Sequence, residues 1–298
     1  MPSLQAKIVL KMLQLRAFSW AKGSLAEQRA RQDRSTRFFK IHNDVIVSKV
    51  SVNGIPGEII DVKGSATGII LYLHGGAYTV GSVHVHRELL ARLAKACQIK
   101  VLAIDYRLAP EHPFPAALVD SLTAYHWLIS QGYDPSRIVI AGDSAGGGLA
   151  IATLISLRDS KEPLPACAVC ISPWLNLSST SEKNNNNNDP LLNPAILGVY
   201  SQYYAGQSDA KNPLISPIFA DIKGLPPMII QAGTNEILFD EIQQFYKKAC
   251  QAGIEIVLDC WQGMFHVFQI IPVLPEAKLS LEKIANFIVN KIDQIHED

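Results

Sequence analysis

The stretch AGDSAGGGLA at residues 141–150 decides the fold, and it directly follows the apolar run SRIVI at residues 136–140. The Val and Ile residues of that run predict a buried strand, and the stretch itself resembles the start of a helix. Glycine inside a helix costs about 1 kcal/mol relative to alanine, so Gly146, Gly147 and Gly148 weaken its first turn. A requirement other than helix stability must explain these three glycines.

A serine held on a sharp strand-to-helix turn would meet that requirement. Gly142-x-Ser144-x-Gly146 has the spacing of a nucleophile elbow, in which the serine hydroxyl projects from the sheet edge and only small neighbours fit. A glycine-rich structural turn and a nucleotide-binding loop are the alternatives. The stretch lacks the G-x-G-x-x-G spacing, and no G-x-x-x-x-G-K-[ST] occurs in the chain. The other motifs of the chain must therefore decide between these interpretations.

Length and composition favour one catalytic domain with insertions. The chain has 298 residues, of which 48% are hydrophobic, so it is long enough to bury one large core. Lys plus Arg and Asp plus Glu number 27 each, which leaves no overall field to attract nucleic acid or an anionic membrane. We expect a small uncharged substrate, no nucleic-acid partner, and a monomer or a homodimer.

The five cysteines are scattered through apolar segments. An odd number without a framework pattern indicates a reduced, cytoplasmic protein. Cys167 and Cys170 form a C-x-x-C within the apolar run PACAVCISPW, and we interpret both as buried free thiols.

The N-terminal stretch is interrupted by polar residues, so it predicts neither a signal peptide nor a stable membrane insertion. Leu4, Ile8, Leu15 and Phe18 instead approximate a helical stripe. We expect an amphipathic helix that covers part of the protein, with a membrane-surface helix as the alternative.

Apolar runs of strand character alternate with helical patterns along most of the chain. This alternation predicts a mostly parallel eight-stranded sheet with helices on both faces. The strands are expected within residues 44–52, 57–63, 68–75, 99–106, 137–143, 166–172, 226–233 and 254–261. The helices are expected within residues 86–97, 115–130 and 149–160, followed by a last helix with an apolar face through residues 277–288.

One region interrupts this alternation: the polar tract SSTSEKNNNNNDP at residues 178–190, followed by the helical pattern at residues 191–206. The five asparagines from Asn184 to Asn188 cannot build a core, so we expect a flexible loop whose position suits the hinge of a lid. The whole region, at about residues 180–215, is predicted to lie above the sheet as an insertion.

A nucleophilic Ser144 needs a base, because a serine hydroxyl is barely ionised at neutral pH. Chains with a nucleophile elbow place the acid second and the histidine last, after the final strand. His266 meets this condition, because it lies in WQGMFHVFQ between the last predicted strand and the last helix. A histidine packed between Phe265 and Phe268 is the structural alternative.

The third group should follow the penultimate strand, where QAGTNEILFDE offers Glu236, Asp240 and Glu241. It must accept the imidazole Nδ1–H and stabilise the imidazolium. Glu236 lies four residues beyond Ala232, at the carboxyl end of the strand, whereas Asp240 suits a helix cap. We favour Glu236 and keep Asp240 as the alternative.

The stretch LYLHGGAYTVGS at residues 71–82 ends a strand in a histidine and two glycines. The glycines allow the backbone to turn its N–H groups toward the site. We therefore expect the N–H groups of Gly75, Gly76 and Ala145 to form an oxyanion hole. A tight structural turn is the alternative.

Several blocks in order resemble the hormone-sensitive-lipase-like branch of the α/β-hydrolases, whose microbial members are carboxylesterases. These blocks are HGGAYTVGS, DYRLAPEHPFPAAL, GDSAGG, SPIFADIKGLPP and GMFHVF. The resemblance runs from about Asp44 to the C-terminus. It implies an α/β-hydrolase catalytic domain at residues 44–298, with a helical cap formed by residues 1–43 and the insertion at residues 180–215.

The resemblance also implies roles for individual residues. Ser144 would be the nucleophile and His266 the base, while the DYR segment with Asp105 and Arg107 would be structural. The chain departs from the family pattern at two positions. Ala77 replaces a third glycine, which is expected to narrow the acyl pocket, and Glu236 stands where the family has aspartate.

We therefore expect a serine carboxylesterase for short- to medium-chain acyl esters that needs no metal or organic cofactor. Tyr78, Trp174 and Leu175 are predicted to wall the substrate pocket. An amidase or deacetylase with the same triad is one alternative. A non-catalytic binding protein like the gibberellin receptors is another, although those receptors lose the histidine that His266 provides here.

Overall fold

The computed structural model describes residues 1–15, 21–36, 41–179 and 189–293. The predictions for Phe18 and for the Asn184–Asn188 tract lie outside these residues.

The eight predicted strands form one sheet in the order β1-β2-β4-β3-β5-β6-β7-β8. β2 pairs antiparallel with β1 and β4, and all the other pairs are parallel, as predicted. The strands are β1 Val45–Val52, β2 Ile55–Val62, β3 Ile69–Leu73, β4 Lys100–Ile104, β5 Ile138–Asp143, β6 Cys167–Ile171, β7 Met228–Gly233 and β8 Ile256–Trp261. β2 starts earlier than predicted, because Asn53 and Gly54 both adopt positive φ (48° and 92°) and make a tight hairpin turn.

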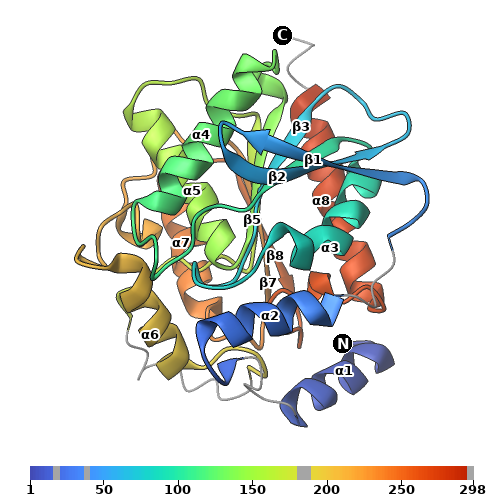
Figure 1. Ribbon diagram of the computed structural model, residues 1–298, viewed down its shortest axis with the longest axis vertical. Coiled ribbons are helices and arrows are strands. Elements are labelled where there is room, and N and C mark those ends of the chain that lie inside the picture. Colours follow the sequence, from blue (N-terminus) through green and yellow to red (C-terminus); the bar gives the residue numbers. More distant parts are fainter. Residues whose placement is uncertain (16–20, 37–40, 180–188, 294–298) are drawn as a thin grey trace.

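Helices cover both faces of the sheet. Figure 1 shows α3 and α8 on one face and α4, α5 and α7 on the other. The helices are α1 Leu4–Leu15, α2 Leu25–Ser35, α3 Val83–Cys97, α4 Ala116–Ser130, α5 Ala145–Asp159, α6 Pro194–Ala205, α7 Phe239–Gln251 and α8 Pro275–Asp293. Among the described residues, 3₁₀ turns also occur at Pro135–Arg137, Pro217–Phe219 and Phe268–Ile270.

Alternate residues of each central strand point to opposite faces and feed two separate cores. In β3, Leu71 and Leu73 join the core under α4, α5 and α7, whereas Ile70 and Tyr72 join the core under α3 and α8. Cys167 and Cys170 of β6 are buried free thiols, as predicted, and burial raises the pKa of each to about 12. The central strands β3, β5, β6 and β7 are buried on both faces, which explains why they read as continuous apolar runs.

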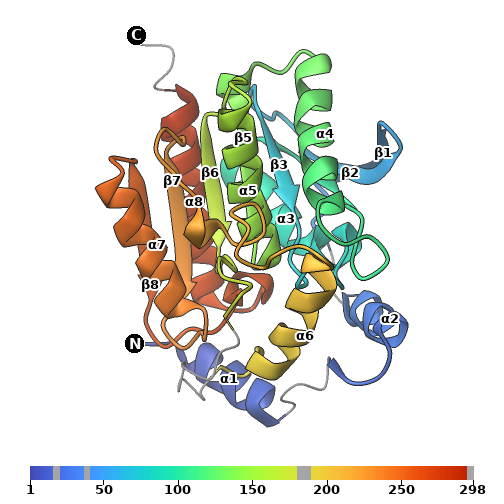
Figure 2. The same cartoon turned by 90° about the vertical axis from the view of Figure 1, so that its left-hand side faces the viewer.

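The helices α1, α2 and α6 lie together at one end of the sheet (Figure 2). The stripe predicted for α1 does not face the protein, because Leu4, Ile8 and Leu15 are exposed. The opposite face of α1 makes the contact, through Ala6, Val9, Leu10 and Leu13 packed in the cluster that holds Met264, Phe265 and Phe268. Both faces of α1 carry apolar residues, so the sequence pattern alone could not select the inner one. Within the described residues, no helix has the length and apolar character needed to cross a membrane.

Candidate active site

Ser144 lies at the junction of β5 and α5 with φ of 53° and ψ of −120°. This conformation is rare for a residue with a Cβ, so the surrounding structure must enforce it. The Ser144 N–H donates to the carbonyl of Ile171 at 2.8 Å, and its carbonyl accepts the Trp174 N–H at 2.9 Å. Contacts with the neighbouring strand thus hold the serine on its strained turn.

The glycines around Ser144 are required by close backbone contacts. A Cβ on Gly146 would lie 2.0 Å from the Leu73 carbonyl oxygen, and one on Gly142 would lie 2.4 Å from the carbonyl oxygen of Gly146. A Cβ on Gly148 would lie 2.3 Å from the Trp174 carbonyl oxygen. The glycines that weaken the helix in isolation therefore let α5 start directly against the sheet.

His266 connects Ser144 to Glu236. Its Nε2 lies 2.9 Å from the Ser144 Oγ, and its Nδ1 lies 2.9 Å from the Glu236 Oε2. A carboxylate only accepts hydrogen bonds, so Nδ1 carries the proton and Nε2 can accept the serine hydroxyl. His266 and Glu236 are only 6% and 1% exposed, so bulk water does not compete for these bonds.

The environment of His266 favours its protonated form. Burial alone lowers the pKa of the imidazole, but the hydrogen bond and the negative charge of Glu236 outweigh burial, so the net pKa is raised. Asp189 and Asp143 add smaller effects in the same direction. The ring is thus a stronger base than an isolated imidazole.

Glu236, and not Asp240, contacts His266. The second carboxylate oxygen of Glu236 accepts the Ser172 hydroxyl at 2.7 Å and also the N–H of Gly233. Ser172 in turn accepts the Val267 N–H at 3.2 Å, which fixes the backbone beside the histidine. Asp240 is exposed in the first turn of α7, and the N-cap residue of that helix is Leu238.

The turn after β3 differs from the sequence prediction at Gly75. The Gly75 N–H donates to the Asp143 Oδ1 at 2.9 Å, so it is not free to bind an oxyanion. Within the described part of the chain, no protein acceptor is recorded for the N–H groups of Gly76, Ala77 or Ala145. The first glycine of the turn therefore fixes its position, and the next two residues line the cavity with N–H groups that bind no described protein acceptor.

Asp143 organises a buried network behind this turn. Besides the Gly75 N–H, it accepts the Tyr72 hydroxyl at 2.8 Å and lies 3.2 Å from Nε2 of His86. The other ring nitrogen of His86 lies 3.0 Å from the Ser82 carbonyl oxygen. Both nitrogens face acceptors, a geometry that favours the imidazolium form paired with the Asp143 carboxylate.

The pKa values of this pair shift in opposite directions, each toward the charged form of its residue. Burial lowers the pKa of His86, but the charge and hydrogen bond of Asp143 reverse this effect and raise it overall. Burial raises the pKa of Asp143, but His86, Tyr72 and Gly75 together lower it. Each residue thus stabilises the charged form of the other.

A cavity of about 230 Å³ opens beside Ser144 and His266. Its remaining lining residues are Gln32, Gly75, Gly76, Ala77, Val80, Gly81, Val85, His86, Asp143, Leu191, Leu192, Leu197, Val267 and Ile270. The side chains of α2, α6 and the segment before α6 therefore close the cavity from the side opposite the sheet.

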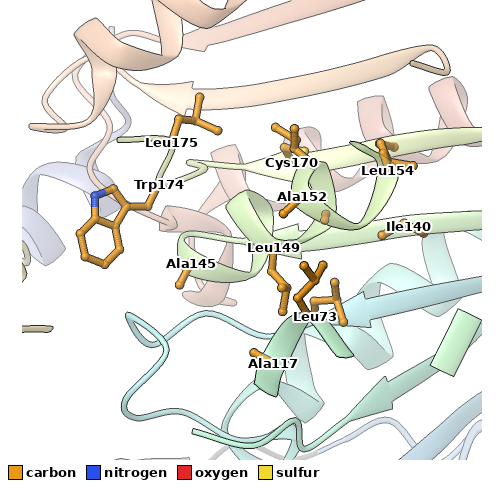
Figure 3. Packing of buried hydrophobic residues seen from close by; sticks show 14 of the residues in the cluster. Leu73, Ala117, Ile140, Ala145, Leu149, Ala152, Leu154, Cys170, Trp174 and Leu175 are labelled. Carbon is orange, nitrogen blue, oxygen red and sulfur yellow. The ribbon is translucent and has the colours of Figure 1, made fainter. Parts of the chain in front are cut away.

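The predicted pocket residues Tyr78, Trp174 and Leu175 do not line this cavity. All three are buried in the core, where the Tyr78 ring stacks on Tyr204 at 3.6 Å between centroids. Trp174 and Leu175 lie beside the start of α5 (Figure 3). The sequence correctly places these residues near the nucleophile elbow. It could not show that their side chains pack in the core instead of facing the cavity.

The sequence interpretation missed several residues of the site. Ser172, Asp143, His86 and Gln32 belong to no motif whose chemistry identifies them, although Ser172 does follow a strand end, where such sheets build their sites. Asp105 and Arg107 are structural, as the resemblance implied. Asp105 accepts the first N–H of α3 at 2.7 Å, and Arg107 pairs with Asp120 of α4.

The chain was compared with known proteins. A family profile described as alpha/beta hydrolase fold matches residues 70–270. An acetyl-hydrolase of Streptomyces hygroscopicus is 44% identical over 222 residues, 74% of each chain, and an esterase of Acinetobacter venetianus is 38% identical over 259 residues, 86% of each chain.

Solved structures agree with these relatives. An esterase from the bacterial hormone-sensitive lipase family superposes with a TM-score of 0.91 at 38% identity, covering 98% of this chain and 99% of the other. EstE5 soaked with p-nitrophenyl butyrate gives 0.92 at 38% identity and the same coverage. The chain therefore belongs to the hormone-sensitive-lipase-like branch of the α/β-hydrolase family and is a carboxylic ester hydrolase.

Proposed function

We propose that the protein hydrolyses carboxylic esters through a Ser144–His266–Glu236 triad and an acyl-enzyme. The hydrogen-bonded chain from Ser144 through His266 to Glu236 is the observation that supports this proposal. His266 removes the proton of Ser144 as the hydroxyl attacks the ester carbonyl, then protonates the leaving alcohol. Water activated by the same imidazole then attacks the acyl group and releases the acid.

The oxyanion of the tetrahedral intermediate is held by the N–H groups of Gly76, Ala77 and Ala145. These three replace the predicted set, since the N–H of Gly75 is occupied by Asp143. Ala77 has φ of 52° and Gly76 has φ of 125°, which turns the backbone sharply at the cavity wall. Preorganised donors of this kind are worth about 3 kcal/mol each in the transition state.

The substrate is an uncharged ester with a short to medium acyl chain. The cavity is small and its walls are mostly apolar, which suits a neutral group rather than an ionic one. Residues 1–43 and 180–215 act as a cap over the catalytic domain at residues 44–298, and their described residues that line the cavity are Gln32, Leu191, Leu192 and Leu197. The relative named acetyl-hydrolase and the structure soaked with a butyrate ester fit this size class.

An active-site probe tests the proposal directly. A fluorophosphonate should label the wild-type protein at Ser144 and leave Ser144→Ala unlabelled, as read by peptide mass spectrometry. A matched series of esters and amides then separates the esterase from the amidase alternative, for which the triad would be the same. Labelling elsewhere, or faster turnover of the amides, would contradict the proposal.

A further inference from the structure

The described segment before α6 begins with a buried carboxylate that the proposed triad does not use. Asp189 is 5% exposed, and it does not itself line the cavity. Leu191 and Leu192, which follow it closely along the chain, do line the cavity. Asp189 therefore adjoins a part of the cap wall that a substrate beside Ser144 would meet.

Both oxygens of Asp189 accept hydrogen bonds, but from different parts of the chain. Oδ1 accepts the N–H groups of Leu191 and Leu192 at 2.9 and 3.0 Å. Oδ2 accepts the N–H of Ile237 at 3.1 Å. Ile237 directly follows Glu236 in the sequence, so one carboxylate joins the cap wall to the turn that carries the proposed catalytic acid.

Asn193, four residues later, shows what a purely local turn requires. Its Oδ1 accepts the N–H groups of Ala195 and Ile196 at 2.9 and 3.2 Å, in the same arrangement that Asp189 uses toward the residues after it. A neutral amide is sufficient for this arrangement. The local turn therefore does not explain why the side chain at position 189 is a carboxylate.

A carboxylate at this position has a cost, because burial raises the pKa of Asp189. The charge of His266 and the local N–H bonds offset this effect only in part. An asparagine that kept the local turn would point its NH₂ group at the N–H of Ile237, donor against donor. The second carboxylate oxygen is therefore needed for the connection to Ile237.

The turn at the other end of this connection is held independently of Asp189. Glu236 accepts the Ser172 hydroxyl at 2.7 Å and also the Gly233 N–H. The Glu236 N–H donates to the Gly233 carbonyl at 3.2 Å. Because this turn is already fixed by its own bonds, the bond from Asp189 acts mainly on the position of the cap wall.

We infer that Asp189 is a positioning residue: it holds Leu191 and Leu192 in the cavity wall by tying them to the turn after β7. It thereby sets how strongly the cavity distinguishes longer from shorter esters, since each methylene gains from contact with a fixed apolar wall. This inference rests on the proposed function, because it assumes that the ester occupies the cavity beside Ser144.

Two pairs of esters test the inference with the intact chain. p-Nitrophenyl butyrate against p-nitrophenyl acetate varies the acyl part, and butyl acetate against ethyl acetate varies the alcohol part. Leu192→Ala removes a side chain of the wall and should lower the ratio of kcat/KM, longer over shorter ester, in the pair whose varied part meets this wall. Asp189→Asn keeps the local turn, breaks the bond to Ile237, and should lower the same ratio about three- to fivefold, as one net hydrogen bond allows.

The ratio separates positioning from the charge of Asp189. The carboxylate helps to raise the pKa of His266, but losing this charge affects every ester alike and cancels in the ratio. Asp189→Ser, whose hydroxyl can also accept the local N–H bonds, is a second variant with the same expected result. Asn193→Ala is the matched control, because it removes only a local turn of the same segment. It should lower thermal stability and leave both ratios unchanged.

Amide hydrogen exchange gives a readout that needs no turnover. Exchange at Ile237 should be faster in Asp189→Asn than in the wild type or in Asn193→Ala. The inference is wrong if exchange at Ile237 is unchanged, if Leu192→Ala alters neither ratio, if Asp189→Asn keeps the wild-type ratio, or if Asn193→Ala lowers it equally. Failure of the proposed function would instead appear as equal ester turnover in wild type and Ser144→Ala.

Discussion

The two sides of the cavity are built differently. On the sheet side, the polar groups of the loops after β3, β5, β6, β7 and β8 are bonded to one another, as in the chain from Ser144 to Glu236 and the network around Asp143. On the cap side, the described residues that line the cavity are the aliphatic Leu191, Leu192 and Leu197, in and before α6, and Gln32 of α2.

This difference separates two tasks. The bonded groups of the sheet side are held in one geometry, which the reaction requires for every ester. In the proposed function, the cap side would contact the parts of the substrate that do not react. Changes on the sheet side should therefore lower turnover of all esters together, and changes on the cap side should alter the ranking of esters.

The largest expected effect is the loss of turnover in Ser144→Ala and His266→Ala. Each change should lower kcat by a factor on the order of 10⁴ or more for every ester tested, because the two groups act as one unit. Steady-state hydrolysis measured by pH-stat checks this. The double variant should be no slower than either single variant, and an additive loss would show that the residues act independently. Unfolding transitions of the variants serve as the control for folding.

The two carboxylates after β7 are expected to differ strongly. Glu236→Gln should lower kcat by a factor on the order of 10³ to 10⁴, because an amide cannot stabilise the imidazolium as a carboxylate does. Asp240→Asn should stay within about threefold of the wild type, since the side chain is exposed and does not contact His266. Equal losses in the two variants would contradict the geometry at Glu236.

The pH profile of kcat/KM is a second test of the contact between Glu236 and His266. His266 must be neutral to act as a base, and its pKa is raised above the ordinary 6.5, so wild-type kcat/KM should fall as the pH drops through a midpoint above 6.5. Glu236→Gln removes the charge that favours the imidazolium, and so should move this midpoint to lower pH. A midpoint that stays in place would show that another group controls the acid limb.

On the sheet side, the sequence could predict the strands and the three residues of the proposed triad. Eight apolar runs gave all eight strands, and the motifs around Ser144, Glu236 and His266 gave the three residues that the structure brings into contact. Local patterns suffice here, because a buried parallel strand must be apolar along its length and its carboxyl end carries the site.

The inward face of α1 and the contacts behind the catalytic residues were predicted poorly, for physical reasons. Gly75 was misassigned because its partner Asp143 is 68 residues away, so the hydrogen bond has no local signal. α1 was placed with the wrong face inward because it is apolar on both faces. Tyr78 lies next to the oxyanion turn in sequence, but its ring stacks on Tyr204 of α6 instead of facing the substrate.

The next largest effect is expected at the His86–Asp143 pair. It tests whether this buried pair stabilises the sheet side of the cavity. His86→Asn leaves a buried carboxylate without its cation and should lower the free energy of unfolding by about 3 kcal/mol near pH 6. His84→Asn, on the same helix but exposed, is the matched control and should change it by less than about 0.5 kcal/mol. Urea unfolding measures both.

The sign of the pH dependence follows from the raised pKa of His86. The stabilisation is fully present below the unfolded-state pKa of histidine, and it is lost as the pH rises through the higher folded-state pKa. The charged or titratable neighbours of the ring include Asp143, Asp105, Tyr72 and His74. Burial lowers the pKa of His74 to about 4, so that ring stays neutral. Wild type should lose this stability at alkaline pH, and a His86→Asn variant with the same alkaline loss would refute the pairing.

The smallest expected effect concerns acyl length and belongs to the cap side. Each methylene that enters the apolar cavity contributes about 0.8 kcal/mol, so kcat/KM should rise about fourfold per methylene and then fall once the cavity is full. Leu197→Ala removes a side chain of α6 that lines the cavity and should move the optimum to a longer acyl chain without lowering the rate for acetate esters. Val199→Ala changes an exposed residue of the same helix that does not line the cavity, so it should leave the series unchanged. Specificity constants for p-nitrophenyl esters of increasing acyl length measure both variants. If Leu197→Ala instead slowed all esters equally, α6 would support the catalytic groups, and the division of tasks between the two sides of the cavity would not hold.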